Sequence, residues 1–224
     1  MKICYLLAGL GMSPAEITRR EEILNRIAAP GTTVEIRVVE DGPMAIENAM
    51  DEYQAMPNVL KFILKHQDEY DALIIGCAGD AGLEAAREQS RIPIVGPGES
   101  SLVLGTLGDK RFCMVTTSPE RAAIKRRLVR EAGLDVNPLV SSHSLDIPVL
   151  EMWKDVKRTQ EHLIRAVKEA KSKGAEVMIL GCLTPAFMES ALLKEAEKEA
   201  GIPLVNPVIT AVKMAEALAA MRAY

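Results

Sequence analysis

The 224-residue chain has little of what proteins need to bind nucleic acid or span a membrane. Aromatic residues make up only 4% of it, too few for a platform on which bases stack. Its 27 Lys and Arg are scattered among 31 Asp and Glu, so the net charge is −4 and no basic arm forms. No apolar run is long enough for a membrane span, and the residues after Met1 lack a signal-peptide cleavage pattern. We expect a cytoplasmic protein that binds neither nucleic acid nor a membrane.

Cysteine and histidine are also sparse. The four cysteines, at positions 4, 77, 113 and 182, form no C-x-x-C pair, and the three histidines are dispersed along the chain. Zinc sites usually need such closely spaced pairs, and thiols stay reduced in a reducing cytosol. We therefore predict neither a metal site nor a disulfide.

What the chain does have is a 48% hydrophobic content and regularly recurring apolar runs. Seven runs of strand length occur, at 2–9, 33–39, 72–77, 92–96, 111–117, 177–182 and 202–207. Most are rich in Ile, Val and Leu without polar alternation, as in strands that are covered on both faces. Segments with helical character lie between them, and two of these end at a glycine after basic residues. The pattern predicts an α/β protein with parallel sheets flanked by helices.

The alternation occurs twice. Cys4 lies in a strand like that of Cys113, 109 positions later, and Cys77 follows a glycine just as Cys182 does, 105 positions later. Each Gly-Cys is then followed by a helical segment and by "IPIVGP" or "IPLVNP". We predict two related halves: residues 1–105 plus 207–224 carrying Cys77, and residues 106–206 carrying Cys182.

The four thiols fall into two environments. Cys4 and Cys113 lie in mid-strand and are interpreted as core residues. Cys77 and Cys182 lie where a strand ends and a helix is expected to begin, which is where ligands bind in open α/β sheets. The positive end of a helix dipole and unpaired backbone N–H groups there would favour a thiolate. The alternative is that they too are buried packing thiols.

Two such thiols facing one molecule across a cleft between the halves could invert a stereocentre. One thiolate would take the proton of an acidic C–H, and the other thiol would deliver a proton to the opposite face. A reference pKa of about 8.5 suits thiols to this exchange of roles.

The sequence resembles the aspartate/glutamate/hydantoin racemase superfamily, and most closely its hydantoin racemase-like branch. The resemblance rests on several stretches in the family's order: "DGPMAIENAMDEYQAMPNVL", "DALIIGCAGDAGLEAARE", "IPIVGPGESS", "RFCMVTTSPE", "HSLDIPVLEM", "GAEVMILGCLTP" and "IPLVNPVITAVKMAEAL". It implies two flavodoxin-like halves related by a pseudo-two-fold axis, with the active site between them. It further implies a cofactor-independent racemase that acts on a small molecule, with Cys77 and Cys182 as the acid/base pair.

The resemblance also implies the substrate contacts. Backbone N–H groups would come from the residues after each thiol: Ala78, Gly79, Asp80, Leu183 and Thr184. Hydroxyl or carboxyl groups would come from the neighbouring loops: Glu99, Ser100, Thr116, Thr117 and Ser118. The Thr-Thr-Ser run could equally be an ordinary helix N-cap. His143 is placed in a loop, either touching the substrate or as a surface histidine. Asp80 and Glu84 are assigned to the first turns of a helix, and residues 125–130 to a solvated helix face.

Some positions depart from the branch. The first strand ends in "LLAGLGMSP" without an asparagine, "LTPAF" follows the second cysteine, and Asn206-Pro207 replaces the usual Asp-Gly. The substrate is therefore left open between a 5-substituted hydantoin, an amino acid and another α-substituted acid. A maleate-type isomerase, a decarboxylase of the same superfamily and a non-catalytic binding module are the rival functions. We also expect a homo-oligomer.

Overall fold

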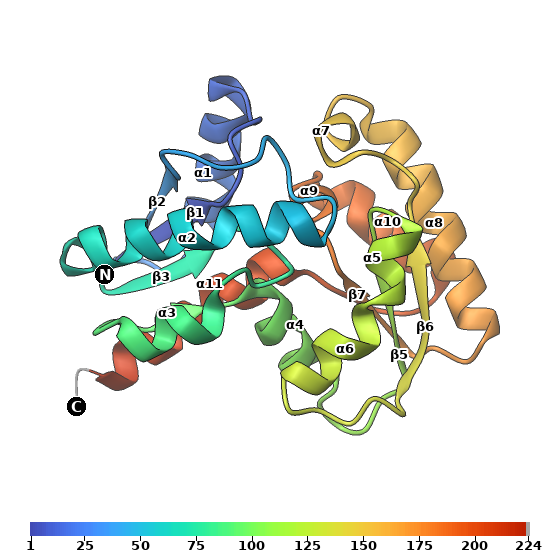
Figure 1. Cartoon of the computed structure of the whole chain (residues 1–224). Coiled ribbons are helices and arrows are strands. Elements are labelled where there is room, and N and C mark those ends of the chain that lie inside the picture. Colours follow the sequence, from blue (N-terminus) through green and yellow to red (C-terminus); the bar gives the residue numbers. More distant parts are fainter. Residues whose placement is uncertain (223–224) are drawn as a thin grey trace. The chain divides into compact units, whose positions relative to one another are not determined.

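A computed structural model of the chain describes residues 1–222, which form two compact units (Figure 1). Unit 1 comprises Met1–Ser100 and the C-terminal segment from Val208, and unit 2 comprises Ser101–Pro207. Residues 223–224, which the sequence assigns to the first half, lie outside the described residues. Each unit contains one four-stranded parallel sheet flanked by helices, so the predicted α/β class is confirmed.

Unit 1 has the strand order β2-β1-β3-β4. Its elements are β1 (Lys2–Leu7), α1 (Pro14–Ile27), β2 (Thr33–Val38), α2 (Ala49–His66), the 3-10 turn η1 (Gln67–Glu69), β3 (Ala72–Ile75), α3 (Leu83–Gln89), β4 (Ile94–Val95), the start of α4 (Pro97–Gly105) and α11 (Pro207–Arg222). The strands β1 and β3 are almost wholly buried, as their apolar composition requires.

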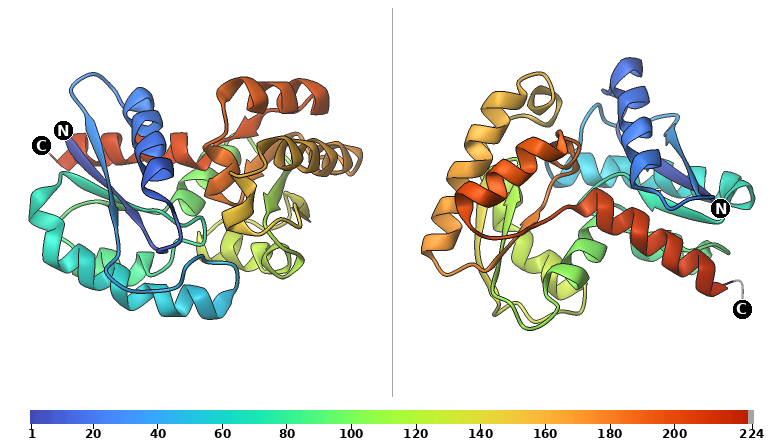
Figure 2. Two further views of the ribbon diagram at one scale, coloured as in Figure 1. Left: turned by 90° about the horizontal axis from the view of Figure 1, so that it is seen from above. Right: turned by 180° about the vertical axis from the view of Figure 1, so that it is seen from behind.

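Helices cover both faces of the unit 1 sheet (Figure 2). Cys4 and Leu6 of β1 point to one face, where they pack with Val59 and Ile63 of α2 and with residues of α3. The other face carries α1 and α11, which are joined where the backbone N–H of Ala29 donates to the Glu216 carboxylate at 2.6 Å. Because both faces are covered, the central strands need no polar alternation.

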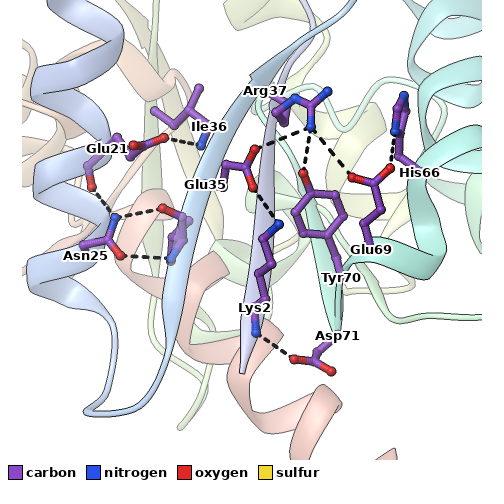
Figure 3. Close-up of polar contacts among 11 residues, drawn as sticks. Lys2, Glu21, Asn25, Glu35, Ile36, Arg37, His66, Glu69, Tyr70 and Asp71 are labelled. Carbon is purple, nitrogen blue, oxygen red and sulfur yellow. Dashed lines mark hydrogen bonds and ion pairs between the residues drawn. The ribbon is translucent and has the colours of Figure 1, made fainter.

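Side chains of α1 fix its position along the edge strand β2 (Figure 3). Asn25 accepts from the backbone N–H of Val34 at 3.0 Å and donates to the same residue's carbonyl at 2.8 Å. Glu21 accepts from the N–H of Ile36 at 2.6 Å. These contacts satisfy backbone groups that an edge strand otherwise leaves unpaired.

Unit 2 has the strand order β6-β5-β7-β8, which repeats the order of unit 1 strand for strand. Its elements are the rest of α4, β5 (Phe112–Thr116), α5 (Pro119–Ala123), α6 (Lys125–Glu131), β6 (Leu139–Ser144), α7 (Val149–Met152), α8 (Val156–Ser172), β7 (Val177–Leu180), α9 (Leu183–Ala186), α10 (Ser190–Ala200) and β8 (Leu204–Val205). Phe112, Met114 and Ile179 pack with Leu102 of α4 and Val129 of α6. The helix α8 packs on β5 and β6, and α10 packs on α8.

The structure corrects the sequence interpretation in unit 2. Residues 139–144 form the edge strand β6, where the sequence suggested a loop. The segment is rich in serine and only partly buried, so it lacks the apolar run that identifies the other strands. Residues 119–131 form two helices, α5 and α6, which meet at Ile124.

Candidate active site

Each unit builds the same turn where its third strand ends. The N–H of Gly76 donates to the carbonyl of Leu6 at 2.7 Å, and that of Gly181 donates to the carbonyl of Val115 at 2.6 Å. A Cβ at Gly76 would lie 2.6 Å from the Leu6 oxygen, and one at Gly181 would lie 3.1 Å from the Val115 oxygen. Glycine therefore precedes both cysteines because the chain passes close to the carbonyl of the neighbouring strand.

Cys77 follows this turn in unit 1 and keeps 9% of its surface exposed. The backbone N–H of Gly79 points at its Sγ at 3.4 Å. The expected position at a helix N-terminus is wrong, because α3 begins only at Leu83. A backbone N–H that donates to sulfur favours the thiolate, so Gly79 supplies locally what the helix end was expected to supply.

Cys182 follows the turn in unit 2 and is also 9% exposed. It is the N-cap residue of the four-residue helix α9, with extended backbone angles (φ −142°, ψ 142°). Leu183 and Thr184 form the first turn of this helix and are buried. One turn has only a small dipole, so the local N–H groups matter more here than a macrodipole does.

The other two cysteines have a different character. Cys4 and Cys113 are fully buried, and burial raises the pKa of each thiol to about 12. The interpretation of both as core residues is confirmed. The four cysteines form no disulfide with one another.

The Asp80 carboxylate caps the N-terminal end of α4. It adopts a left-handed backbone conformation (φ 54°), and its carboxylate accepts from the N–H groups of Gly98 at 2.8 Å and Glu99 at 2.6 Å. Asp80 thus precedes α3 and caps a different helix, so its assignment to a first helical turn is wrong. Glu84 does lie in the first turn of α3. A Cβ at Gly96 would lie 2.5 Å from the Asp80 carboxylate, which explains the small residue there.

The two residues from the loop after β4 are held by their own partners. The Glu99 carboxylate pairs with both terminal nitrogens of the Arg87 guanidinium. Ser100 is buried, and its hydroxyl contacts the Pro97 carbonyl at 3.2 Å and the Thr210 hydroxyl at 3.3 Å. Both side chains thus help to fix the first turn of α4, and a role in substrate binding stays a prediction.

The Thr-Thr-Ser run divides between two roles. Ser118 caps α5, since its hydroxyl accepts from the N–H of Arg121 at 3.3 Å. Thr116 donates to the carbonyl of Gly181 at 3.3 Å and so holds the turn that carries Cys182. Thr117 is buried, and its carbonyl accepts from the Ser144 hydroxyl.

His143 is neither in a loop nor on the surface. It lies in β6 and is buried, with Nε2 at 2.8 Å from the Ser141 hydroxyl and Nδ1 at 3.7 Å from the Glu169 carboxylate. Burial lowers its pKa, Lys173 lowers it further, and Glu169 opposes the shift.

Sequence reasoning missed Lys125. Residues 125–130 were assigned to a solvated face, and Arg126, Arg127 and Arg130 are indeed exposed. Lys125 is fully buried, and its Nζ donates to the carbonyl of Gly181 at 3.2 Å. The position could have been found by aligning "SP" at 118–119 with "SP" at 13–14, which matches Lys125 to the buried Arg20.

Within residues 1–222 no three His, Cys, Asp or Glu side chains are grouped so that they could hold a metal ion. Over the same part of the chain, no helix has the length and apolar content that a membrane crossing needs.

Comparisons with known proteins agree with the fold. A family model described as Asp/Glu/hydantoin racemase matches residues 13–215. Hydantoin racemase from Rhizobium meliloti is 34% identical over 80% of this chain and 73% of its own length, and that from Pseudomonas sp. (strain NS671) is 36% identical over 79% and 70%. The solved structure of allantoin racemase from Klebsiella pneumoniae superposes with a TM-score of 0.84 at 29% identity, covering 99% of this chain and 89% of that one. The chain belongs to the Asp/Glu/hydantoin racemase family.

Proposed function

We propose that this protein is a racemase that inverts the carbon next to a carbonyl in a 5-substituted hydantoin, with Cys77 and Cys182 as its acid/base pair. The observation that carries the proposal is the repeated turn, which gives each unit one cysteine in the same place, buried except for 9% of its surface. The hydantoin and allantoin racemases that it resembles act on substrates of this class by name.

The reaction needs two groups. One removes the proton of the stereocentre, and the other delivers a proton to the opposite face of the same carbon. A thiolate removes the proton from the stereocentre, and the electron pair of the C–H bond passes into the adjacent carbonyl as an enolate. The other thiol then protonates the opposite face of the carbon, which leaves the product inverted and the two sulfurs with exchanged protonation states. General acid–base catalysis of this type contributes on the order of 10²–10⁴-fold.

The chemistry requires no cofactor, because the ring carbonyl itself accepts the electron pair. Backbone N–H groups of the turns after the thiols, at Ala78, Gly79, Leu183 and Thr184, are suited to stabilise the developing oxyanion. Thr117 and the other residues of the predicted contact set would orient the ring. We infer that the two units are the two halves expected from sequence, each contributing one thiol.

The test is proton exchange with solvent. Each enantiomer of a panel of 5-substituted hydantoins, allantoin and free amino acids is incubated with the protein in D₂O, followed by chiral chromatography and mass spectrometry. The proposal predicts inversion with one deuterium entering the stereocentre of a hydantoin. Exchange confined to free amino acids would refute the substrate class, and absence of inversion on every compound would refute the racemase.

A further inference from the structure

We propose that Trp153 is a substrate-binding residue of unit 2, whose indole N–H donates to a ring carbonyl of the hydantoin. The identity of the ligand rests on the proposed function. The need for an acceptor does not, because it follows from the surroundings of the indole.

The indole of Trp153 has a buried donor without an acceptor. Its Nε1 is covered by protein, and within residues 1–222 no group accepts a hydrogen bond from it. An indole N–H can only donate, and a buried tryptophan usually finds a partner for it. A donor that loses water and gains no acceptor costs free energy, so such an atom calls for a partner from outside the chain. The candidates are a bound water and a ligand.

The position of Trp153 favours a ligand. It ends the segment 145–153, which leaves β6 at the carboxyl edge of the sheet, where Cys182 follows β7. Two backbone N–H groups of this segment donate to the carbonyls of Thr116 and Thr117, at 2.9 Å each. Near its end, α7 packs against α9, the helix that begins directly after Cys182. The segment thus contacts both parts of unit 2 that the family resemblance assigns to the substrate.

The matching position in unit 1 is Ile46. Both residues lie two positions before the N-cap of a long helix, which is Asn48 for α2 and Asp155 for α8. Ile46 packs against the apolar cluster to which Cys77 belongs. The chain therefore has a hydrogen-bond donor in unit 2 at the place where unit 1 has only an apolar side chain.

The donor is uncharged, which limits the kind of acceptor. An uncharged N–H suits a neutral carbonyl oxygen, such as those of a hydantoin ring, whereas a free carboxylate is typically bound by arginine. Lys154 has its Nζ 5.7 Å from the centre of the Trp153 ring, but it is exposed, so salt screens its charge. We therefore expect the acceptor to be a ring carbonyl rather than the carboxylate of an amino acid.

Contact with Nε1 requires local movement. The atom is covered, although the indole as a whole is only partly buried. The backbone beside it is held, because Met152 is buried and its carbonyl accepts from the Thr159 hydroxyl at 2.9 Å. An acceptor can therefore reach Nε1 only after the groups that cover this atom shift. Binding must then change the surroundings of the indole.

The test uses the fluorescence emission of Trp153, which is the one tryptophan in the sequence. The unaltered protein is titrated with 5,5-dimethylhydantoin, which has both ring carbonyls but no hydrogen on the carbon between carbonyl and nitrogen, so it cannot be inverted. Calorimetry follows the same titration independently of the indole. We expect the emission to change and to saturate at the dissociation constant that calorimetry gives.

Two variants remove the donor. Trp153→Phe keeps an aromatic ring, and benzothienylalanine at position 153, in which sulfur replaces the N–H, keeps the shape of the indole as well. We expect calorimetry to give a dissociation constant about tenfold higher for each, as for the loss of one hydrogen bond. Lys154→Met is the control, because it removes the neighbouring charge and keeps the indole, and it should leave the dissociation constant unchanged.

Two results would overturn the assignment of Trp153 alone: constant emission while calorimetry shows binding, or an unchanged dissociation constant in both variants that lack the N–H. The first needs no variant, so it decides even if Trp153→Phe fails to fold. Absence of any binding heat would overturn this proposal together with the substrate class. None of these measurements needs turnover, so failure of the racemase itself would show in the D₂O experiment and not here.

Discussion

At the scale of single residues, position within a strand separates the four cysteines. Cys4 and Cys113 lie in mid-strand, where burial holds their thiols protonated. Cys77 and Cys182 lie two residues past a strand end, where each keeps a small exposed surface. The sequence predicts this division because strand interiors are marked by apolar neighbours and strand ends by glycine. It did not predict the buried Lys125, because a basic run of a helix normally faces solvent.

The two glycines before the thiols differ in how closely they approach the neighbouring strand. Gly76→Ala would place its Cβ 2.6 Å from the Leu6 carbonyl oxygen and 3.0 Å from the Tyr5 ring, so backbone must move. Gly181→Ala would meet the Val115 oxygen at 3.1 Å and the end of the flexible Lys125 side chain at 3.0 Å. We expect Gly76→Ala to lower the free energy of unfolding by about 1–3 kcal/mol, and Gly181→Ala by less. Urea denaturation measures both, and a larger loss for Gly181→Ala would contradict this geometry.

At the scale of elements, the apolar strands were predictable and their neighbours less so. The runs at 72–77 and 177–182 contain β3 and β7, because buried parallel strands are continuously apolar. The sequence did not indicate the edge strand β6, because half of its residues are serine and the strand is only partly buried. The contact of Asp80 with the start of α4 could not be predicted either, because a cap from a distant residue leaves no periodic signal in the sequence.

The cap on α4 distinguishes two carboxylates that sequence reasoning treated alike. Asp80→Ala removes the acceptor of two N–H groups at the start of α4, and we expect it to lower the free energy of unfolding by about 1–2 kcal/mol. The exposed Glu84 is the control, and Glu84→Ala should change stability by less than about 0.5 kcal/mol. Thermal or urea unfolding compares the two, and equal losses would show that Asp80 does not hold α4.

His143 of β6 should make the free energy of unfolding depend on pH. Burial places the folded-state pKa of His143 below its ordinary value of 6.5, so the unfolded chain binds a proton more readily. The stability that His143 contributes is therefore complete above about pH 6.5 and is lost as the pH falls through the folded-state pKa. His143→Gln, which keeps a polar group near Ser141, should lose less stability than the unaltered protein between pH 7.5 and 5. Urea midpoints at the two pH values measure this, and a steeper loss in the variant would contradict it.

At the scale of the whole molecule, the two units repeat one order of strands. Strand order, the Gly-Cys turns and the Ser-Pro helix starts recur in both units, as the sequence repeat indicates. The order of strands within each sheet is that of the flavodoxin-like halves that the family resemblance implies, so it could be anticipated. The detailed contacts around each thiol could not, because they join residues up to 70 positions apart in the sequence, such as Leu6 and Gly76.

The association of several copies is a further property of the whole molecule. Homo-oligomers with closed symmetry are common, and we expect this chain to form one. Light scattering coupled to size-exclusion chromatography should give a mass that is a whole multiple of 24.4 kDa, and at least twice that value. A mass of one chain at micromolar concentration would refute the expectation.

The central claim is that one turnover uses both Cys77 and Cys182, and inversion by single-thiol variants tests it most directly. Cys77→Ala and Cys182→Ala are compared with Cys113→Ala, each with both enantiomers of the hydantoin that the unaltered protein inverts, by chiral chromatography in D₂O. We expect each of the first two variants to lose inversion in both directions, by at least about 10²-fold, whereas any folded Cys113→Ala protein retains it. Inversion at the parent rate by either single-thiol variant would refute the two-thiol mechanism.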